Sequence, residues 1–215
     1  KIEIFKISIK EKINLIKMEK KVKDFYNSYS ERFSQTRYAV WDVIKQFNNS
    51  IKPNSKILDA GCGNGKNMVY LQNEGHTVKG VDFSDSLLDI CKEKSLDVQY
   101  SDIRKLPYED NTFDYVISIA VIHHLSSYYE QDKAITELLR VTKKGGKVLF
   151  TVWAVEQDEH SRRDLESGSN LIPFEDTVRY YYVFNQKTFQ ELIARYTVDK
   201  IFWEKSNWNA ILVKT

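Results

Sequence analysis

The sequence predicts an α/β protein with a doubly wound, seven-stranded and mostly parallel sheet, helices on both faces and an antiparallel hairpin at the C-terminal end. Three observations support this prediction. Short apolar stretches alternate with stretches of helical periodicity, as in repeated strand–helix–strand units. A glycine-rich turn follows the first apolar stretch. The last two apolar stretches, 198–204 and 209–214, are separated only by a short turn, which is typical of a hairpin.

Periodicity and turn residues give the order of the elements. Phe25, Tyr29 and Phe33 recur every four residues and indicate a helix. The unbroken apolar run 113–120 is typical of a central parallel strand, which is buried on both faces. The elements predicted before the hairpin are helical residues 19–48, a strand at 56–61, a helix at 65–74, a strand at 77–82, a helix capped by Ser84, strands at 98–102 and 113–120, a helix at 130–141, a strand at 147–153 and a helix at 186–195.

Two segments are harder to assign. Residues 1–18 alternate Ile and Leu with Lys and Glu, and we interpret them as a basic N-terminal arm or an engineered extension. One domain then spans 19–215. The chain between 154 and 182 is polar, and we expect a loop over the mouth of the site. Its piece 167–169, Ser-Gly-Ser, is also consistent with an engineered shortening of that loop.

Composition excludes some classes of protein. A chain of 215 residues with 42% hydrophobic content suffices for one domain with a sizeable core. The net charge of +2 is nearly balanced, which does not indicate nucleic-acid binding but leaves room for a local basic patch, and we expect no DNA partner. The N-terminal residues lack an apolar run long enough for a signal peptide or a membrane span. Cys62 and Cys91 make no disulfide framework or zinc site by themselves. We therefore expect a cytoplasmic or nuclear protein with no membrane partner and no metal.

The turn after the first strand carries the strongest chemical signal. Asp59 is followed by glycine at every second position, Gly61, Gly63 and Gly65. Glycine lets the backbone bend sharply and lets a ligand approach the main chain. The dinucleotide fingerprint needs its third glycine one position later, where Lys66 stands, and a nearby carboxylate would repel a pyrophosphate. S-adenosylmethionine has an ammonium and a sulfonium in place of phosphates, so the turn predicts a site for this methyl donor.

Further candidate cofactor residues lie where the other strands end. Asp82 ends the second strand, where a carboxylate can accept hydrogen bonds from both ribose hydroxyls, and Phe83 follows it. Ala120 ends the central strand. The pair Asp102-Ile103 resembles a segment that brackets adenine, in which the carboxylate accepts from the exocyclic amine and the backbone of the next residue completes the contact.

Several blocks of sequence make the assignment more specific. They are Ile117-Ser118-Ile119-Ala120-Val121-Ile122-His123-His124-Leu125, Val152-Trp153-Ala154-Val155-Glu156-Gln157, Arg179-Tyr180-Tyr181-Tyr182-Val183-Phe184 and the aromatic-rich stretch 25–41. With them, residues 22–215 resemble the eukaryotic tRNA wobble-uridine methyltransferases, a domain that is also fused to an AlkB-type oxygenase in animals. Two departures are a shorter polar insert before the Arg-Tyr-Tyr block and a Lys/Ile-rich arm at 1–17.

The resemblance implies a Rossmann-like class I methyltransferase fold and S-adenosylmethionine as methyl donor. It implies a reaction in which the carboxylate of 5-carboxymethyluridine, at the wobble position of the tRNA anticodon loop, becomes a methyl ester. It also implies a partner, a small zinc-binding activator protein that forms a heterodimer with the catalytic subunit.

This chemistry sets the requirements for the substrate site. A carboxylic acid has a pKa of about 4, so the substrate is an anion at neutral pH and needs no strong base. It does need a cation to hold its second oxygen, and Arg37 and Arg179 are the candidates because a guanidinium fits a carboxylate. We expect Tyr38 and Tyr180 to stack on or bound the uracil.

Other candidate residues follow from position. We expect His124 to face the substrate and His123 to pack locally, since adjacent histidines point in different directions. Trp153 ends the fifth strand and is a candidate wall of the pocket. Arg162 and Arg163 are candidates for contacts to tRNA phosphates.

Two other functions remain open at this point. A small-molecule O- or N-methyltransferase on the same fold would want a base such as His124 for a hydroxyl or amine substrate. A non-catalytic binding subunit would have no need of the intact glycine turn and Asp82, which therefore speak against it.

Overall fold

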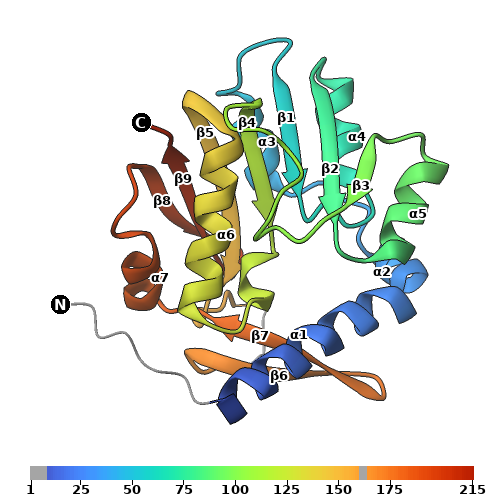
Figure 1. Cartoon of the computed structure of the whole chain (residues 1–215), viewed down its shortest axis with the longest axis vertical. Coiled ribbons are helices and arrows are strands. Elements are labelled where there is room, and N and C mark those ends of the chain that lie inside the picture. Colours follow the sequence, from blue (N-terminus) through green and yellow to red (C-terminus); the bar gives the residue numbers. More distant parts are fainter. Residues whose placement is uncertain (1–8, 160–163) are drawn as a thin grey trace.

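A computed structural model gives the structure of residues 9–159 and 164–215 (Figure 1). Its main sheet has seven strands in the order β3-β2-β1-β4-β5-β9-β8. The first five are parallel, whereas β9 is antiparallel to both β5 and β8. The strands of this sheet are β1 (Lys56–Ala60), β2 (Thr77–Asp82), β3 (Val98–Tyr100), β4 (Phe113–Ile119), β5 (Thr142–Trp153), β8 (Val198–Glu204) and β9 (Asn207–Val213). This arrangement confirms the predicted fold class and the C-terminal hairpin.

The helices also follow the predicted order. They are α1 (Ile9–Ser28), α2 (Ser30–Thr36), α3 (Asp42–Asn48), α4 (Lys66–Asn73), α5 (Asp85–Glu93), η1 (Ile122–His124), α6 (Tyr128–Val141) and α7 (Gln186–Ile193). Ser84 caps α5 as predicted, because its hydroxyl accepts the N–H of Leu87. The region 19–48, expected to be helical, consists of parts of three helices. Helix α1 also runs through the boundary that we predicted between residues 18 and 19.

The core lies on both faces of the sheet, because successive strand residues point in opposite directions. Leu58 of β1 and Phe150 of β5 pack with the apolar faces of α6 and α7. Their neighbours Ile57 and Leu149 pack on the other face with α3, α4 and α5. The sheet is therefore covered on both faces, and its carboxyl edge remains for a ligand.

The segment 154–182 differs from the prediction of a loop. Two antiparallel strands, β6 (Gly168–Phe174) and β7 (Thr177–Val183), form a separate hairpin around a turn at Glu175-Asp176. Side chains of β6 alternate between half-buried and exposed, and Pro173 lies within it, so its sequence carries a weak strand signal. The Ser-Gly-Ser piece marks the start of β6.

Helix α1 and the β6–β7 hairpin lie together across the end of the sheet toward which the parallel strands point (Figure 1). The ring of Phe25 on α1 meets the ring of Phe174 on β6 edge-on, with centroids 5.1 Å apart. At the tip of the hairpin, Asp176 accepts a hydrogen bond from the Tyr29 hydroxyl, and Glu175 pairs with Arg32. These contacts form a cover over the carboxyl edge of the sheet.

Candidate active site

The glycine turn between β1 and α4 needs each of its three glycines. Gly61, Gly63 and Gly65 have φ angles of +86°, +55° and +75°, which side-chain-bearing residues rarely adopt. A Cβ at Gly61 would also overlap the side chain of Val121. The N–H groups of Gly61 and of the next residue both donate to the carbonyl of Val81, at 2.8 and 2.9 Å, and this ties the turn to β2.

Asp59 lies at the base of this turn with an unsatisfied charge. Its side chain is 0% exposed, and neither carboxylate oxygen has a hydrogen-bond partner in the described structure. The pKa of Asp59 is raised to about 7, mainly by burial and also by the charge of Asp82, while the charge of Lys66 opposes the shift. A buried carboxylate without a partner is costly, so this position favours a cationic ligand group. The ammonium of S-adenosylmethionine is such a group, and Asp59 therefore fits the methyl donor.

Asp82 is held between the glycine turn and α5. One oxygen accepts the N–H of Gly63 and the other accepts the N–H of Ser84, both at 2.9 Å. Each carboxylate oxygen has more than one acceptor site, so both can also receive a ribose hydroxyl. Burial raises the pKa of Asp82, and the backbone hydrogen bonds oppose that rise. Phe83, next in the chain, lies near the ring of Tyr26 with centroids 6.4 Å apart.

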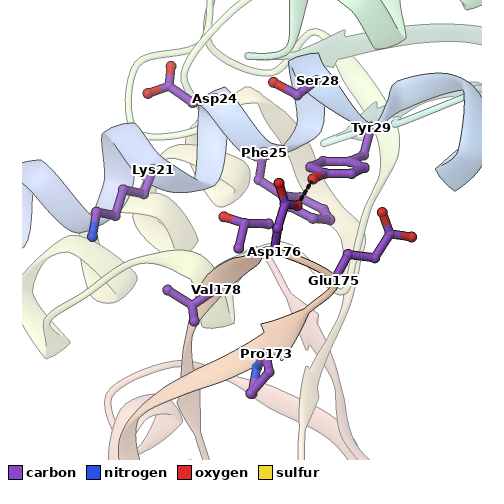
Figure 2. Close-up of a pocket in the computed structure, with 10 residues that line it drawn as sticks. Lys21, Asp24, Phe25, Ser28, Tyr29, Pro173, Glu175, Asp176 and Val178 are labelled. Carbon is purple, nitrogen blue, oxygen red and sulfur yellow. Dashed lines mark hydrogen bonds between the residues drawn. The ribbon is translucent and has the colours of Figure 1, made fainter.

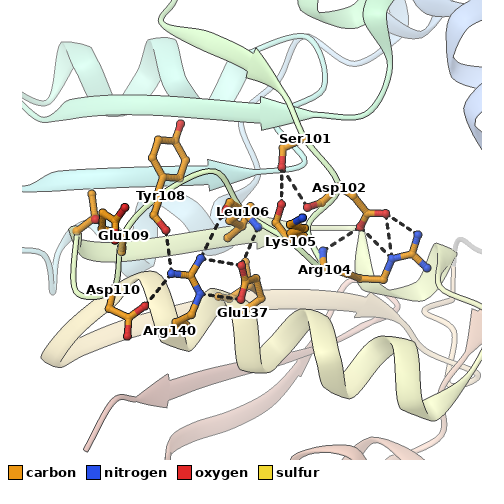
Figure 3. Close-up of polar contacts among 12 residues, drawn as sticks. Ser101, Asp102, Arg104, Lys105, Leu106, Tyr108, Glu109, Asp110, Glu137 and Arg140 are labelled. Carbon is orange, nitrogen blue, oxygen red and sulfur yellow. Dashed lines mark hydrogen bonds and ion pairs between the residues drawn. The ribbon is translucent and has the colours of Figure 1, made fainter.

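The other predicted cofactor residues lie at neighbouring strand ends. Ala120 follows β4 with a φ of +60°, and its N–H donates to the hydroxyl of Thr151 at 2.9 Å. Asp102 lies in the loop after β3 and is bound by Arg104 (Figure 3). The side chain of Ile103 packs into the core on the α6 face.

Tyr26 on α1 was not singled out from the sequence. It interacts with all three predicted catalytic residues, His124, Arg179 and Arg37. Its hydroxyl donates to Nε2 of His124 at 2.9 Å. Burial and the Tyr181 hydroxyl raise the pKa of Tyr26, while the charges of Arg179 and Arg37 lower it, so both cations lie within electrostatic range. The sequence signal for this position was its place in the aromatic-rich stretch 25–41.

The two histidines, which are adjacent in the chain, have different partners. Nδ1 of His124 donates to the carbonyl of Tyr180 at 2.9 Å, so Nε2 is the acceptor of the Tyr26 hydrogen bond. Both ring nitrogens are occupied, which corrects the expectation that His124 faces the substrate. Burial lowers its pKa to about 4, and the ring is neutral at neutral pH. His123 is buried, and its Nδ1 accepts the N–H of Trp153 at 3.1 Å.

Arg179 is buried in a cage of aromatic rings. Its side chain is 5% exposed, and its guanidinium carbon lies 4.8 Å from the ring centre of Phe25, 4.9 Å from that of Phe174 and 5.4 Å from that of Tyr181. Its Nε has no hydrogen-bond partner, and no carboxylate of the described residues pairs with it. A buried cation of this kind is suited to an anionic group of a ligand.

Arg37 lies nearer the glycine turn, at the end of α2. Its guanidinium lies 4.7 Å from the ring of Phe33 and donates to the hydroxyl of Thr36 at 3.0 Å. Its carbonyl accepts a hydrogen bond from Asn64 of the turn at 3.3 Å. Arg37 is half-buried, so its guanidinium remains accessible.

The predicted aromatic walls of the substrate site need one clear correction. Tyr180 is 1% exposed, and its hydroxyl bonds to Ser169 and to the carbonyl of Ser126, so its ring cannot stack on a base in this arrangement. Alternation along β7 instead places Tyr181 on the face that carries Arg179. Tyr181 stacks on Trp153 with ring centres 4.1 Å apart.

The remaining predicted substrate contacts are those of Tyr38 and of the two arginines at 162 and 163. Tyr38 is 80% exposed and has no place in a closed pocket, although it lies next to Arg37. Arg162 and Arg163 lie outside the described residues.

Two grooves lie beside the cover. One, of about 720 Å³, is lined by α1 and the hairpin tip and contains the carboxylates of Asp24, Glu175 and Asp176 together with Lys21 (Figure 2). The other, of about 880 Å³, runs between α2 and α5 and is also rich in carboxylates. Like charge opposes a phosphate backbone, so neither groove is suited to nucleic acid.

Comparisons with known proteins agree with this site. Residues 58–150 match a family model described as a methyltransferase domain. The chain is 46% identical over 145 residues to an Arabidopsis thaliana protein named tRNA (carboxymethyluridine(34)-5-O)-methyltransferase, covering 67% of this chain and 35% of that protein. It is 31% identical over 226 residues to a Schizosaccharomyces pombe protein of the same name, covering 90% of this chain and 96% of that one.

Solved methyltransferase structures share the fold. One is the complex of a Haloferax volcanii methyltransferase with the Trm112 methyltransferase activator, with a TM-score of 0.69, 16% identity, and coverage of 90% of this chain and 97% of that one.

The chain spans about a third or less of the length of the first relatives it matches, including the Arabidopsis protein. No helix of the described residues is long and apolar enough to cross a membrane. The sequence match covers nearly the full length of the fission yeast protein, and the glycine turn and the unpaired Asp59 fit a methyl-donor site. This chain therefore belongs to the tRNA (carboxymethyluridine(34)-5-O)-methyltransferase family and uses S-adenosylmethionine.

Proposed function

We propose that this protein methylates the carboxylate of 5-carboxymethyluridine at the wobble position of tRNA, giving 5-methoxycarbonylmethyluridine. The observation that carries the proposal is the buried guanidinium of Arg179, which has no carboxylate partner among the described residues. A site that holds a methyl donor on one side and an unpaired cation on the other is suited to an anionic methyl acceptor. The names of the relatives supply the specific nucleoside.

S-adenosylmethionine supplies an electrophilic methyl group on a sulfonium. When bound, it would be held at its nucleoside by the glycine turn and Asp82, and Asp59 would lie toward its ammonium. One carboxylate oxygen of the substrate would accept this methyl group, and the sulfur would leave as a neutral thioether. No proton is transferred in this step, because the substrate is already ionised.

On this proposal, the protein's contribution is alignment and partial desolvation of the acceptor. Arg179, with Arg37 on the side of the glycine turn, holds the second carboxylate oxygen so that the first points at the methyl group. The neutral His124 and the Tyr26 hydroxyl fix the positions of α1 and β7 beside these cations. A hydroxyl or amine acceptor would need a base, and both nitrogens of His124 are occupied, so a small-molecule O- or N-methyltransferase is less well supported.

We also propose an activator partner. The Haloferax methyltransferase, which shares this fold, is solved in complex with the Trm112 activator. We expect this chain to form a heterodimer with a small zinc-binding activator subunit of that kind, and to work in the cytoplasm or nucleus, where tRNA is found. An isolated chain that is stable and fully active would contradict this expectation.

The test uses tRNA from cells that lack their own wobble methyltransferase. This tRNA is incubated with the chain, the activator and labelled S-adenosylmethionine, and then digested to nucleosides for mass spectrometry. We expect labelled 5-methoxycarbonylmethyluridine. Cofactor binding without any labelled nucleoside would overturn the proposed substrate while leaving the cofactor site intact.

A further inference from the structure

The guanidinium of Arg104 binds Asp102 in the loop that follows β3 (Figure 3), and it also contacts α1 and α6. Nε of Arg104 lies 2.9 and 3.0 Å from the two carboxylate oxygens of Asp102, and the backbone N–H of Arg104 donates to Oδ1 at 2.8 Å. Nη1 of Arg104 donates to Glu19 on α1 and to Glu130 on α6, both at 2.8 Å. The other oxygen of Glu19 accepts from the hydroxyl of Ser126 at 3.1 Å.

The carboxylates around Arg104 differ in their exposure to solvent. The side chains of Glu19 and Glu130 are 20% and 28% exposed, and that of Arg104 is 22% exposed, so these contacts are partly shielded from solvent. Asp102 is the most open member, at 44%. Burial raises its pKa, but the hydrogen bonds and charge of Arg104 outweigh that effect, so the carboxylate stays ionised. Asp102 is thus fixed on one side by Arg104 and remains accessible on the other.

We propose that Arg104 is a positioning residue that couples recognition of adenine by Asp102 to the docking of α1 over the cofactor. Toward the ligand, its fork holds the Asp102 carboxylate at the end of β3, oriented to accept from the exocyclic amine. Toward the cover, the same guanidinium holds Glu19. The inference rests on the cofactor site and on the predicted role of Asp102, and it does not depend on the identity of the methyl acceptor.

Helix α1 is also attached near Asp82, so its docking bears on the binding of the whole nucleoside. Asn27, two turns beyond Glu19, accepts hydrogen bonds from the Ser84 hydroxyl and the Ser86 N–H at the start of α5. The same helix carries Tyr26, which bonds to His124. A helix attached both at the adenine end and near Asp82 covers the nucleoside along its length. Because coupling between two equilibria is reciprocal, cofactor binding should tighten α1, and a loosened α1 should weaken cofactor binding.

Arg140 provides a matched control at the other end of the same loop (Figure 3). It pairs with Glu137 and Asp110 and donates to the backbone carbonyls of Leu106 and Tyr108, but it does not touch Asp102 or α1. Arg104→Gln and Arg140→Gln each remove one arginine from a network of carboxylates. A purely structural role predicts similar effects of the two substitutions on cofactor affinity.

The first experiment measures the dissociation constant of S-adenosylhomocysteine by calorimetry, with no tRNA present. We expect Arg104→Gln to weaken binding about tenfold, the scale of one pair of charge-assisted hydrogen bonds, and Arg140→Gln to leave it within twofold. Arg104→Lys should recover part of the loss. Equal affinities for Arg104→Gln and the wild type, with both folded by circular dichroism, would overturn the proposal.

The second experiment separates positioning from general stability. S-inosylhomocysteine carries a carbonyl oxygen where adenine has its amine, so the ratio of its dissociation constant to that of S-adenosylhomocysteine reports recognition of the amine. We expect this ratio to shrink in Arg104→Gln and to be unchanged in Arg140→Gln.

A third measurement follows the attachment of α1. Hydrogen exchange of the backbone amides of residues 17–28 should slow on ligand binding in the wild type but not in Glu19→Gln. An unchanged ratio, or protection of α1 that persists in Glu19→Gln, would contradict the coupling. Failure to methylate tRNA would bear only on the proposed substrate.

Discussion

The role that we propose for Arg179 depends on the surroundings of its side chain. An exposed arginine is paired with water and gains little from one more anion, whereas this one is buried among three rings and has an unpaired Nε. An arriving carboxylate would therefore satisfy a charge that is already desolvated. The cage also restricts the orientation of the guanidinium, which reduces the entropy lost on binding.

The first prediction concerns the two arginines. We expect Arg179→Gln to lower kcat/KM for tRNA by about 100-fold, comparable with the loss of one preorganised donor in other enzymes. Arg179→Lys keeps the charge but loses the fork and should lose less. The dissociation constant of S-adenosylhomocysteine should not change. If Arg37→Gln abolishes turnover while Arg179→Gln does not, Arg37 is the residue that holds the carboxylate.

The second prediction concerns Asp59 and pH. Its native pKa of about 7 lies above the unfolded value, so the native state binds the extra proton and stability falls as pH rises from about 4 to 7. The full penalty, at most about 4 kcal/mol, is present above pH 7. Asp59→Asn removes this penalty. Its unfolding free energy relative to the wild type, from urea titrations without ligand, should therefore rise between pH 4 and pH 8. A relative stability that does not depend on pH would show that the pKa of Asp59 is not raised in the native state.

At the scale of elements, the glycine turn and the cover define the site together. The turn supplies close backbone approach, and α1 and α2 enclose it. Phe33 of α2 lies 3.7 Å from the position of a Cβ at Gly63. Asn64 of the turn donates to Ser34 and to the carbonyl of Arg37. The cofactor site therefore forms between the sheet and a helical segment that precedes it in the chain.

The third prediction uses two glycines with the same backbone angle. Gly65 and Gly145 both have a φ of +75°, but a Cβ at Gly65 would overlap Leu96, whereas one at Gly145 would meet no atom within 4 Å. We expect Gly145→Ala to cost about 1 kcal/mol of unfolding free energy from backbone strain alone. Gly65→Ala should cost about 1–3 kcal/mol more and weaken cofactor binding. Equal costs and intact binding in both variants would show that the turn tolerates a side chain.

The fourth prediction concerns the attachment of the hairpin to α1. Phe25 is buried where it meets the half-buried Phe174, whereas the bond between Tyr29 and Asp176 is exposed to solvent. We expect Phe25→Ala to lower the unfolding free energy by about 3 kcal/mol and to speed hydrogen exchange in 168–183. Asp176→Asn should change the melting temperature very little, because exposed polar contacts compete with water. The opposite ranking would mean that the hairpin tip anchors the cover.

For the whole molecule, cofactor binding and stability are linked. The protein without cofactor carries the cost of an unpaired Asp59, and a ligand that binds only the native state adds stability by mass action.

The fifth prediction follows from this linkage. S-adenosylhomocysteine at 100 times its dissociation constant should add about 2.7 kcal/mol of stability. For a domain of this size, this raises the melting temperature by about 5–10 °C. Asp82→Ala should abolish most of the shift, because it removes the acceptor of the ribose hydroxyls. Adenosine triphosphate serves as the control and should give no shift, since a polyphosphate is repelled by Asp59 and Asp82.

The sequence by itself determined the sheet and the cofactor turn. Both depend on local patterns: apolar strands such as 113–119, capping by Ser84, and glycines at the three positions where the backbone has a positive φ. Such patterns are visible in single stretches of chain because their physical causes, backbone sterics and hydrophobic periodicity, act over a few residues.

Only the tertiary structure decided the burial and the partners of Tyr26, His124, Tyr180 and Arg179. Each depends on partners that are distant in sequence, as when His124 bonds to Tyr26 of α1 and to the carbonyl of Tyr180 of β7. The polar segment 154–182 became a hairpin for the same reason, because α1 supplies the apolar surface against which β6 and β7 pack. Burial and hydrogen bonding are properties of the assembled fold, so a list of residue types cannot tell an exposed tyrosine such as Tyr38 from a buried one such as Tyr180.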